Sequence, residues 1–177
     1  MAFGREFEAS SGPGPDGALG QMAWGLALMQ MNRMSEAIGV LRRLSARNKN
    51  DPLANWYFAE ALNRDGVEPG SDREAEAIRA LEQSVRSNPE VPQSRVLFGK
   101  MLLKRGQVDR AIEHFEKALD LDKDNVAAAY QLAQVYRKIG NARRAAELFA
   151  IVSKAKEEDP GQFTQRGLLH IIREGSR

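Results

Sequence analysis

Side chains with catalytic potential are scarce in this chain of 177 residues, which has two histidines and no cysteine. His114 directly follows Glu113, and a carboxylate beside an imidazole is a pair that could move protons. The second histidine, His170, lies near the C-terminus. The sequence has no glycine-rich phosphate loop, no G-x-S-x-G elbow and no H-E-x-x-H zinc motif. We therefore expect a protein that is not an enzyme, with no catalytic residue, no metal site and no cofactor.

Side chains suited to recognition are more numerous. Aromatic rings beside Lys or Arg suit a peptide that carries apolar and acidic groups, and amide side chains can bond to a peptide backbone. The candidate binding residues are Trp56, Tyr57, Glu60, Asn63, Lys100, Lys104, Tyr130, Gln134, Arg137 and Lys138. They form one site only if repeated elements bring them together. An alternative role for Trp56 and Tyr130 is packing between helices.

A repeat of 34 residues supplies such elements. The pairs of similar residues at this separation are Gly99 and Ala133, Gly106 and Gly140, Ala111 and Ala145, and Phe115 and Phe149. A whole set of matches at one spacing indicates a repeated structural unit. Apolar residues recur at helical spacing after each of the two glycines, so the unit contains helices.

Extending this spacing towards the N-terminus divides the chain into four units, which are 18–51, 52–91, 92–125 and 126–159. The second unit is longer, because Ala59 and Gly99 are 40 residues apart.

The extra residues of the second unit fall at 67–73. Pro69 and Gly70 favour a turn there, and Ser71 with Glu74 matches the S-x-x-E capping box. This pattern predicts that the second helix of the unit begins early, after a longer loop. The loop is either a tolerated surface insertion or a contact for a partner.

Three sets of positions make these units resemble the tetratricopeptide repeat, which is a pair of antiparallel helices. The small residue of the first helix is Gly25, Ala59, Gly99 or Ala133, the turn residue is Asn32, Gly66, Gly106 or Gly140, and the alanine of the second helix is Ala37, Ala77, Ala111 or Ala145. The usual aromatic residue near the start of the unit is displaced by one place, to Trp56 and Tyr130. The resemblance covers residues 18–159 and implies an all-α fold, a right-handed α-solenoid of antiparallel helix pairs.

The physical chemistry of these positions supports the same fold. Small residues let two helices approach closely, and we expect the small residue of the first helix to face the alanine of the second. A left-handed residue ends the first helix, and Gly or Asn tolerates that conformation best. The residue at the place of Phe115 should project onto the next unit, because one unit cannot bury its apolar face alone. His114 is expected at the outer surface.

The two ends of the chain differ from the units. Residues 1–17 are rich in Gly, Ser and Pro, which predicts a flexible leader. Residues 160–177 contain Phe163, Gly167 and Ile171 at helical spacing, which predicts a C-terminal capping helix and tail. The same apolar segment could instead pack on a second copy, so a homo-oligomer through the terminal helix stays open.

Composition narrows the expected location and partners. The net charge of +2 is only mildly basic, so no nucleic acid partner is expected. The mean hydropathy is -0.48, and the sequence has no apolar run long enough to span a membrane. Because no signal-peptide pattern opens the sequence, we expect a cytoplasmic protein without a transmembrane segment.

The resemblance implies a binding role. First helices line the concave groove in this family, and the ten candidate residues fall on first helices. We expect a non-enzymatic adaptor or scaffold whose groove binds a protein or peptide with acidic and apolar groups. One subfamily clamps a C-terminal carboxylate with Lys, Asn and Arg, but the matching positions here hold Met22, Leu26, Tyr57, Gln93 and Leu97 in one register and Trp56, Glu60, Leu97, Ala127 and Gln131 in the other. The alternatives are a self-associating structural protein and a targeting module of a larger enzyme or complex.

Overall fold

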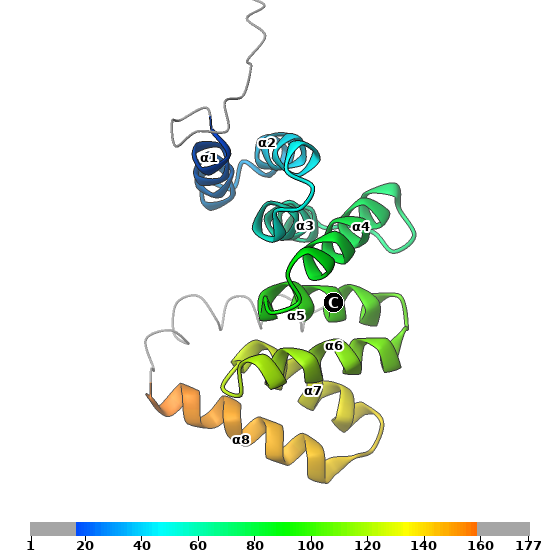
Figure 1. Cartoon of the computed structure of the whole chain (residues 1–177). Helices are drawn as coiled ribbons and strands as arrows, with labels where there is room; N and C mark the ends of the chain where they lie inside the picture. The colour runs from blue at the N-terminus through cyan, green and yellow to red at the C-terminus, as the bar shows by residue number, and fades with distance from the viewer. Residues whose placement is uncertain (1–16, 159–177) are drawn as a thin grey trace, which may run out of the picture.

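The computed structural model describes residues 17–158, which contain eight α-helices (Figure 1). They are α1 (Ala18–Gln30), α2 (Met34–Arg47), α3 (Pro52–Asp65), α4 (Asp72–Ser87), α5 (Pro92–Lys104), α6 (Val108–Leu121), α7 (Val126–Lys138) and α8 (Ala142–Glu158). No strand occurs between residues 17 and 158. The prediction of an all-α helical repeat is therefore confirmed for the described residues.

The helices form four consecutive pairs that stack from α1 and α2 to α7 and α8 (Figure 1). Each helix packs against the next in chain order, and α1, α3, α5 and α7 also contact one another in succession. We call these four the first helices and α2, α4, α6 and α8 the second helices. The predicted capping helix lies outside the described residues, as does the predicted leader up to residue 16.

A left-handed residue follows each first helix, as the repeat pattern predicts. The φ angles are 59° at Asn32, 87° at Gly66, 71° at Gly106 and 84° at Gly140. Side chains rarely adopt this conformation, and Gly and Asn do so at the lowest cost. The prediction made from the turn positions is confirmed at all four places.

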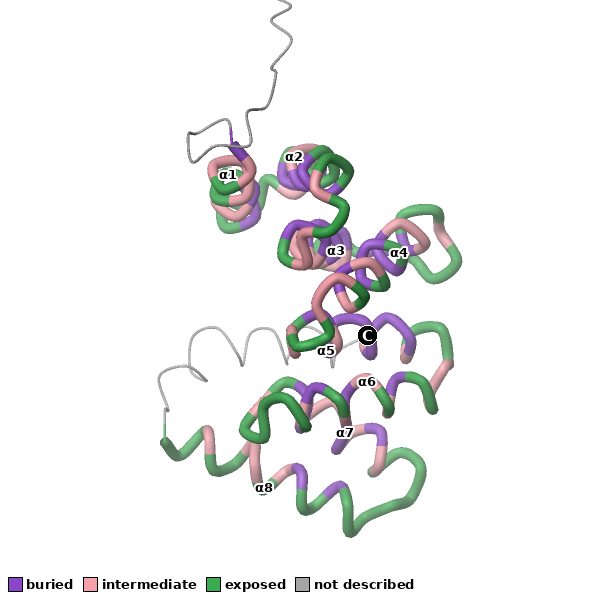
Figure 2. The backbone as a smooth tube through the Cα atoms, in the orientation of Figure 1, coloured by how far each residue is buried: buried purple, intermediate pink, exposed green. Residues whose placement is uncertain are grey.

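The core runs without interruption through all four pairs (Figure 2). Leu28 on α1 and Leu148 on α8 belong to the same cluster of buried residues as the fully buried Phe115 on α6. In Figure 2 the buried segments face neighbouring helices and the exposed ones lie outside. This arrangement explains why one pair alone cannot hold its apolar face out of water.

Two glycines set the distance between the helices of a pair. A Cβ placed on Gly99 would lie 2.6 Å from Cε1 of Phe115, and a Cβ on Gly25 would lie 2.6 Å from Cδ2 of Leu41. In these two pairs the small residue therefore meets a large side chain of its own second helix. The further expectations, that the small residue faces the alanine and that Phe115 projects onto the next unit, stay predictions.

Hydrogen bonds of Glu74 connect the insertion of the second pair to the third pair. The Ser71 hydroxyl accepts a hydrogen bond from the Glu74 amide at 3.2 Å, as in the predicted capping box. The Glu74 carboxylate accepts from the Gly70 amide at 2.7 Å and from Nε of Arg105 at 2.9 Å. Since Glu74 is only 1% exposed, the carboxylate of this ion pair is buried in the fold. Helix α4 begins at Asp72, which is early relative to Ala77, as predicted.

Candidate binding surface

The aromatic part of the candidate surface lies on α3. Asp51 caps this helix by accepting from the amides of Leu53 at 2.9 Å and Ala54 at 3.1 Å. The rings of Trp56 and Tyr57 lie 4.5 Å apart between centroids, and both side chains are partly exposed. Nε1 of Trp56 is buried and has no hydrogen-bond partner. One edge of Trp56 therefore contributes to packing between helices while the rest of the ring remains accessible.

A hydrogen bond between side chains joins α3 to α5. Nζ of Lys104 donates to Oδ1 of Asn63 at 3.1 Å, although these residues are 41 positions apart. Next to it, Glu60 pairs with Arg64 at 2.7 Å. Lys100 lies one turn before Lys104, so both ammonium groups share one side of α5. The structure thus joins α3 and α5 through one pair of candidate residues, Asn63 and Lys104.

The candidate residues of α7 form a separate group. Asn125 caps α7 by accepting from the Ala128 amide at 2.9 Å. Nε2 of Gln134 donates to the Tyr130 hydroxyl at 2.8 Å. Within residues 17–158, no hydrogen bond or ion pair joins the α7 residues to the candidate residues of α3 or α5.

Two side chains of this α7 group contact an aromatic ring of α8. The Tyr130 ring meets the Phe149 ring edge-on at 6.3 Å. The guanidinium of Arg137 lies 5.9 Å from the same ring. Packing is therefore a second role of both residues, whereas Lys138 is exposed.

We call the ten candidate residues on α3, α5 and α7 the first-helix surface. It carries four cations, Lys100, Lys104, Arg137 and Lys138, and one carboxylate, Glu60. Because Glu60 is already paired with Arg64, it does not neutralise the four. The surface therefore carries more positive than negative charge, together with the adjacent rings of Trp56 and Tyr57 on α3.

The position of His114 differs from the sequence expectation. Its ring is partly buried and lies 4.4 Å from the Phe98 ring, between centroids, and its Nδ1 atom is buried without a partner. Burial, and then the charges of Arg95 and Arg110, lower its pKa to about 4. His114 is thus a neutral, partly buried residue that packs against Phe98 rather than a surface residue.

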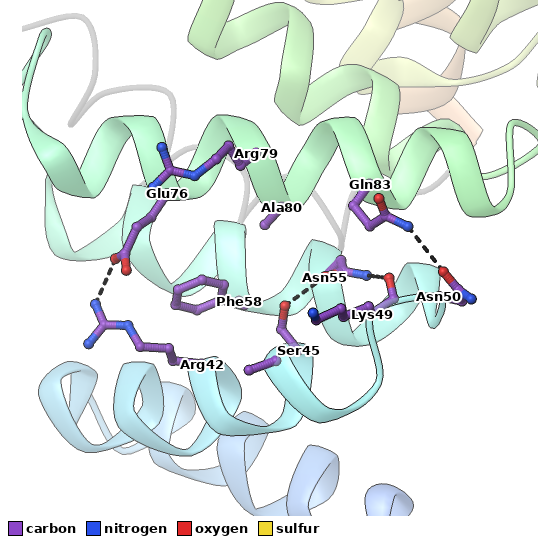
Figure 3. A pocket seen from close by; sticks show the side chains of 11 residues that line it. Arg42, Ser45, Lys49, Asn50, Asn55, Phe58, Glu76, Arg79, Ala80 and Gln83 are labelled. Carbon is purple, nitrogen blue, oxygen red and sulfur yellow. Dashed lines mark hydrogen bonds and ion pairs between the residues drawn. The ribbon is translucent and has the colours of Figure 1, made fainter.

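A hollow of about 400 Å³, which the sequence analysis did not predict, lies between α2, α3 and α4 (Figure 3). Nη2 of Arg42 pairs with Glu76 at 2.7 Å on one side. Phe58 lies at the base, and the Arg42 guanidinium is 5.6 Å from its ring. On the other side, Nε2 of Gln83 donates to Oδ1 of Asn50 at 3.2 Å. We call this cavity the α2–α4 hollow.

The described residues hold neither a cluster of metal ligands nor a membrane-spanning helix. The described chain contains no group of three or more His, Cys, Asp or Glu side chains that could hold a metal ion. None of its eight helices is long and apolar enough to cross a membrane.

Comparison with protein families identifies the repeat. Models of the tetratricopeptide repeat match residues 73–126 and residues 102–163. The two matches together span more than half of the chain and include all of α5, α6, α7 and α8. The chain belongs to the tetratricopeptide repeat family.

Curated relatives are longer than this chain. A BBSome complex member BBS4 homolog of Drosophila melanogaster is 28% identical over 152 residues, which are 82% of this chain and 30% of the relative. DnaJ homolog subfamily C member 3 of Gallus gallus is 34% identical over 88 residues, which are 50% of this chain and 17% of the relative. The chain therefore spans less than a third of either protein.

Solved structures share the fold at low sequence identity. A crystal structure of MamA superposes with a TM-score of 0.68 at 19% identity and covers 82% of each chain. The first tetratricopeptide repeat domain of Spaghetti (RPAP3), bound to the HSP90 peptide SRMEEVD, has a TM-score of 0.61 at 18% identity. That match covers 69% of this chain and 92% of the other. Likeness at this level of identity shows the fold alone.

Proposed function

We propose that this chain is a non-enzymatic adaptor that binds a segment of a protein partner along the first-helix surface. The partner segment carries acidic groups for the four cations and an apolar group for the rings of Trp56 and Tyr57. The observation that carries the proposal is the Lys104–Asn63 hydrogen bond at 3.1 Å, which joins the aromatic side of α3 to the cationic side of α5.

A neighbouring structure supports peptide binding but not the same ligand. The RPAP3 domain is bound to a peptide from HSP90 whose printed sequence ends in Glu-Val-Asp. A carboxylate clamp needs Lys and Asn at positions that hold Trp56 and Glu60 here. We therefore propose an internal acidic and apolar segment as the ligand. We also propose a cytoplasmic location and no nucleic acid partner.

Charge reversal tests the proposal with matched variants. The groove variant carries Lys100→Glu, Arg137→Glu and Lys138→Glu on first helices. The control variant carries Arg43→Glu, Arg86→Glu and Lys117→Glu, three cations that are exposed on second helices. A partner isolated with the wild-type chain is then titrated against both variants by calorimetry. The groove variant should bind at least about tenfold more weakly, and the control variant should stay within about twofold of the wild type.

The exposed side of α1 favours a second candidate function, self-association. Leu19 and Trp24 on α1 and Met31 directly after it are 67%, 49% and 54% exposed, and α1 contains no charged residue. An apolar face of this kind is typical of a surface that packs on another protein.

Light scattering tests self-association directly. If α1 pairs with a second copy, the mass rises with protein concentration, and Trp24→Glu with Leu19→Glu abolishes the rise. A wild-type mass that stays at 19.7 kDa across concentrations would exclude this candidate.

A further inference from the structure

The α2–α4 hollow exists because the second pair lacks two large side chains that the third pair has. Phe58 and Phe98 occupy equivalent places on α3 and α5, 40 residues apart. In the third pair, His114 covers Phe98 with its rings 4.4 Å apart. Ala77 and Ala111 are equivalent, so the counterpart of His114 is Ala80, three residues after Ala77. Its methyl group is smaller than the imidazole, and the guanidinium of Arg42 lies over the Phe58 ring instead, 5.6 Å from the centroid.

The second missing side chain is that of an arginine. Asn55 on α3 is the counterpart of Arg95 on α5, again 40 residues apart. Arg95 donates from Nε to the Pro89 carbonyl at 2.9 Å, and it lies close enough to His114 for its charge to act on the imidazole. Asn55 is shorter and turns back to the carbonyls of Lys49 and Asp51, each at 2.8 Å. The second pair therefore has smaller side chains at both places, and the α2–α4 hollow lies beside them.

The walls of the hollow favour a negative ligand. Arg42, Lys49 and Arg79 supply three positive charges, and Glu76 supplies one negative charge. The Glu76 carboxylate is held by Arg42 at 2.7 Å. Neither Lys49 nor Arg79 takes part in an ion pair within residues 17–158, so both side chains are available to a ligand. The floor of the hollow is mixed, because the buried Phe58 and Ala80 lie there with the Ser45 hydroxyl, which donates to Oδ1 of Asn55 at 2.6 Å.

We propose that the α2–α4 hollow is a second binding site, which takes a large apolar side chain from an acidic peptide segment. The apolar side chain displaces the Arg42 guanidinium from the Phe58 ring and takes a place like that of His114 beside Phe98. Carboxylates on either side of it pair with Arg79 and Lys49. A volume of about 400 Å³ lies in the range of protein sites that enclose a side chain or small ligand.

This site is separate from the first-helix surface. Asn55 and Phe58 are three residues apart and share one face of α3, whereas Trp56 is turned about 200° from Phe58 around the helix. The other lining residues come from α2, α4 and the connection after α2. One partner, or two, can therefore occupy both sites at the same time, and the failure of one site does not imply the failure of the other.

Nuclear magnetic resonance with a defined peptide tests the second site. The full chain, labelled with ¹⁵N, is titrated with the capped peptide Asp-Glu-Phe-Glu-Asp. Two control peptides replace the central Phe by Gly or the four acids by Lys. We expect saturable shifts in the amide signals around Phe58, Ala80 and Lys49, with a dissociation constant on the order of 1 mM or below. Both control peptides should bind at least about tenfold more weakly.

Two variants of the chain identify the site. Ala80→Leu fills the hollow with the residue type found at the equivalent Leu148, and Arg79→Glu reverses an exposed charge without changing the core. Each should weaken peptide binding at least about tenfold, while Lys117→Glu, an exposed charge on α6 outside both sites, should change it by less than about twofold. If Ala80→Leu fails to fold, Arg79→Glu still decides the question.

Several results would overturn this proposal. They are the absence of saturable shifts, equal binding of the Gly peptide, and shifts confined to the first-helix surface. Tighter binding of a short RNA at the same amide signals would instead assign the hollow to nucleic acid.

Discussion

Gly99 fixes how closely α5 and α6 approach, since a Cβ there would lie 2.6 Å from the Phe115 ring. Phe115 is fully buried and has no room to withdraw. Gly39, in contrast, lies on α2 with only the flexible end of Arg43 nearby, at 3.8 Å. The two glycines therefore provide a matched pair for testing close packing against helix propensity.

We predict opposite effects of alanine at these two positions. Gly99→Ala should destabilise the chain by about 1–2 kcal/mol, because overpacking outweighs the gain in helix propensity. Gly39→Ala should stabilise it by about 0.5–1 kcal/mol, because no contact opposes that gain. Urea denaturation of both variants beside the wild type measures the difference. Equal stability of the two variants would contradict the described packing.

His114 makes stability depend on pH. Its pKa is about 4 in the folded chain, against an ordinary value near 6.5. The unfolded chain therefore takes up the proton first as the pH falls, and the free energy of unfolding decreases between pH 6.5 and 4. Well above pH 6.5 both states are neutral at this residue, and its contribution is constant.

We predict that His114→Phe removes this dependence. The Phe ring keeps the contact with Phe98 and leaves no buried nitrogen without a partner, so the variant should be at least as stable at pH 7. Between pH 7 and pH 5 the wild type should lose on the order of 1 kcal/mol more than the variant, allowing for the partly exposed ring. Thermal unfolding at the two pH values measures this. Parallel losses in both proteins would show that His114 is solvated.

At the scale of elements, the insertion before α4 is part of the joint between the second and third pairs. The Glu74 carboxylate binds both the Gly70 amide and Arg105, so it holds the loop against the turn after α5. The sequence left a tolerated insertion and a partner contact open, and this geometry describes a structural role.

We predict that Glu74→Ala weakens this joint. Removing a buried carboxylate leaves Arg105 and the Gly70 amide without a partner and should cost roughly 2 kcal/mol. Lys123→Ala breaks an exposed ion pair with Asp120 and should cost less than about 0.5 kcal/mol. Urea denaturation compares the two. A cost for Glu74→Ala no larger than that of the control would show that the joint does not depend on this ion pair.

The sequence predicts the features of these elements that recur at a fixed spacing. Asn32 and Gly140 mark left-handed turns because every pair needs a residue with positive φ after its first helix, and Gly and Asn adopt this conformation most easily. The α2–α4 hollow was not predicted, because it lies beside two small residues, Asn55 and Ala80. No sequence motif marks the absence of a large side chain. Aligning the units by size, with His114 opposite Ala80, would have indicated it.

At the scale of the whole molecule, the stacking of pairs determines which residues meet. Asn63 and Lys104 belong to different pairs and meet because α3 contacts α5. The sequence could predict that first helices share one side of the solenoid, but not which side chains engage their own second helix. Tyr130 and Arg137 both do so through Phe149, which reduces how freely they can meet a partner.

The lysines report separately on the surfaces of the molecule. Lys100, Lys104 and Lys138 lie on the first-helix surface, whereas Lys117, Lys123 and Lys154 lie elsewhere. Lys49 belongs to the α2–α4 hollow. Acetylation of lysine amines, measured by mass spectrometry with and without a bound partner, therefore shows which surface the partner covers.

This lysine footprint tests the proposed function most directly. We predict that a purified partner lowers the acetylation rate of Lys100, Lys104 and Lys138 at least about threefold, because bound acidic groups cover their amines, and leaves Lys117 and Lys154 unchanged. Protection confined to Lys117, Lys123 and Lys154, with the three first-helix lysines as reactive as in the free chain, would contradict it.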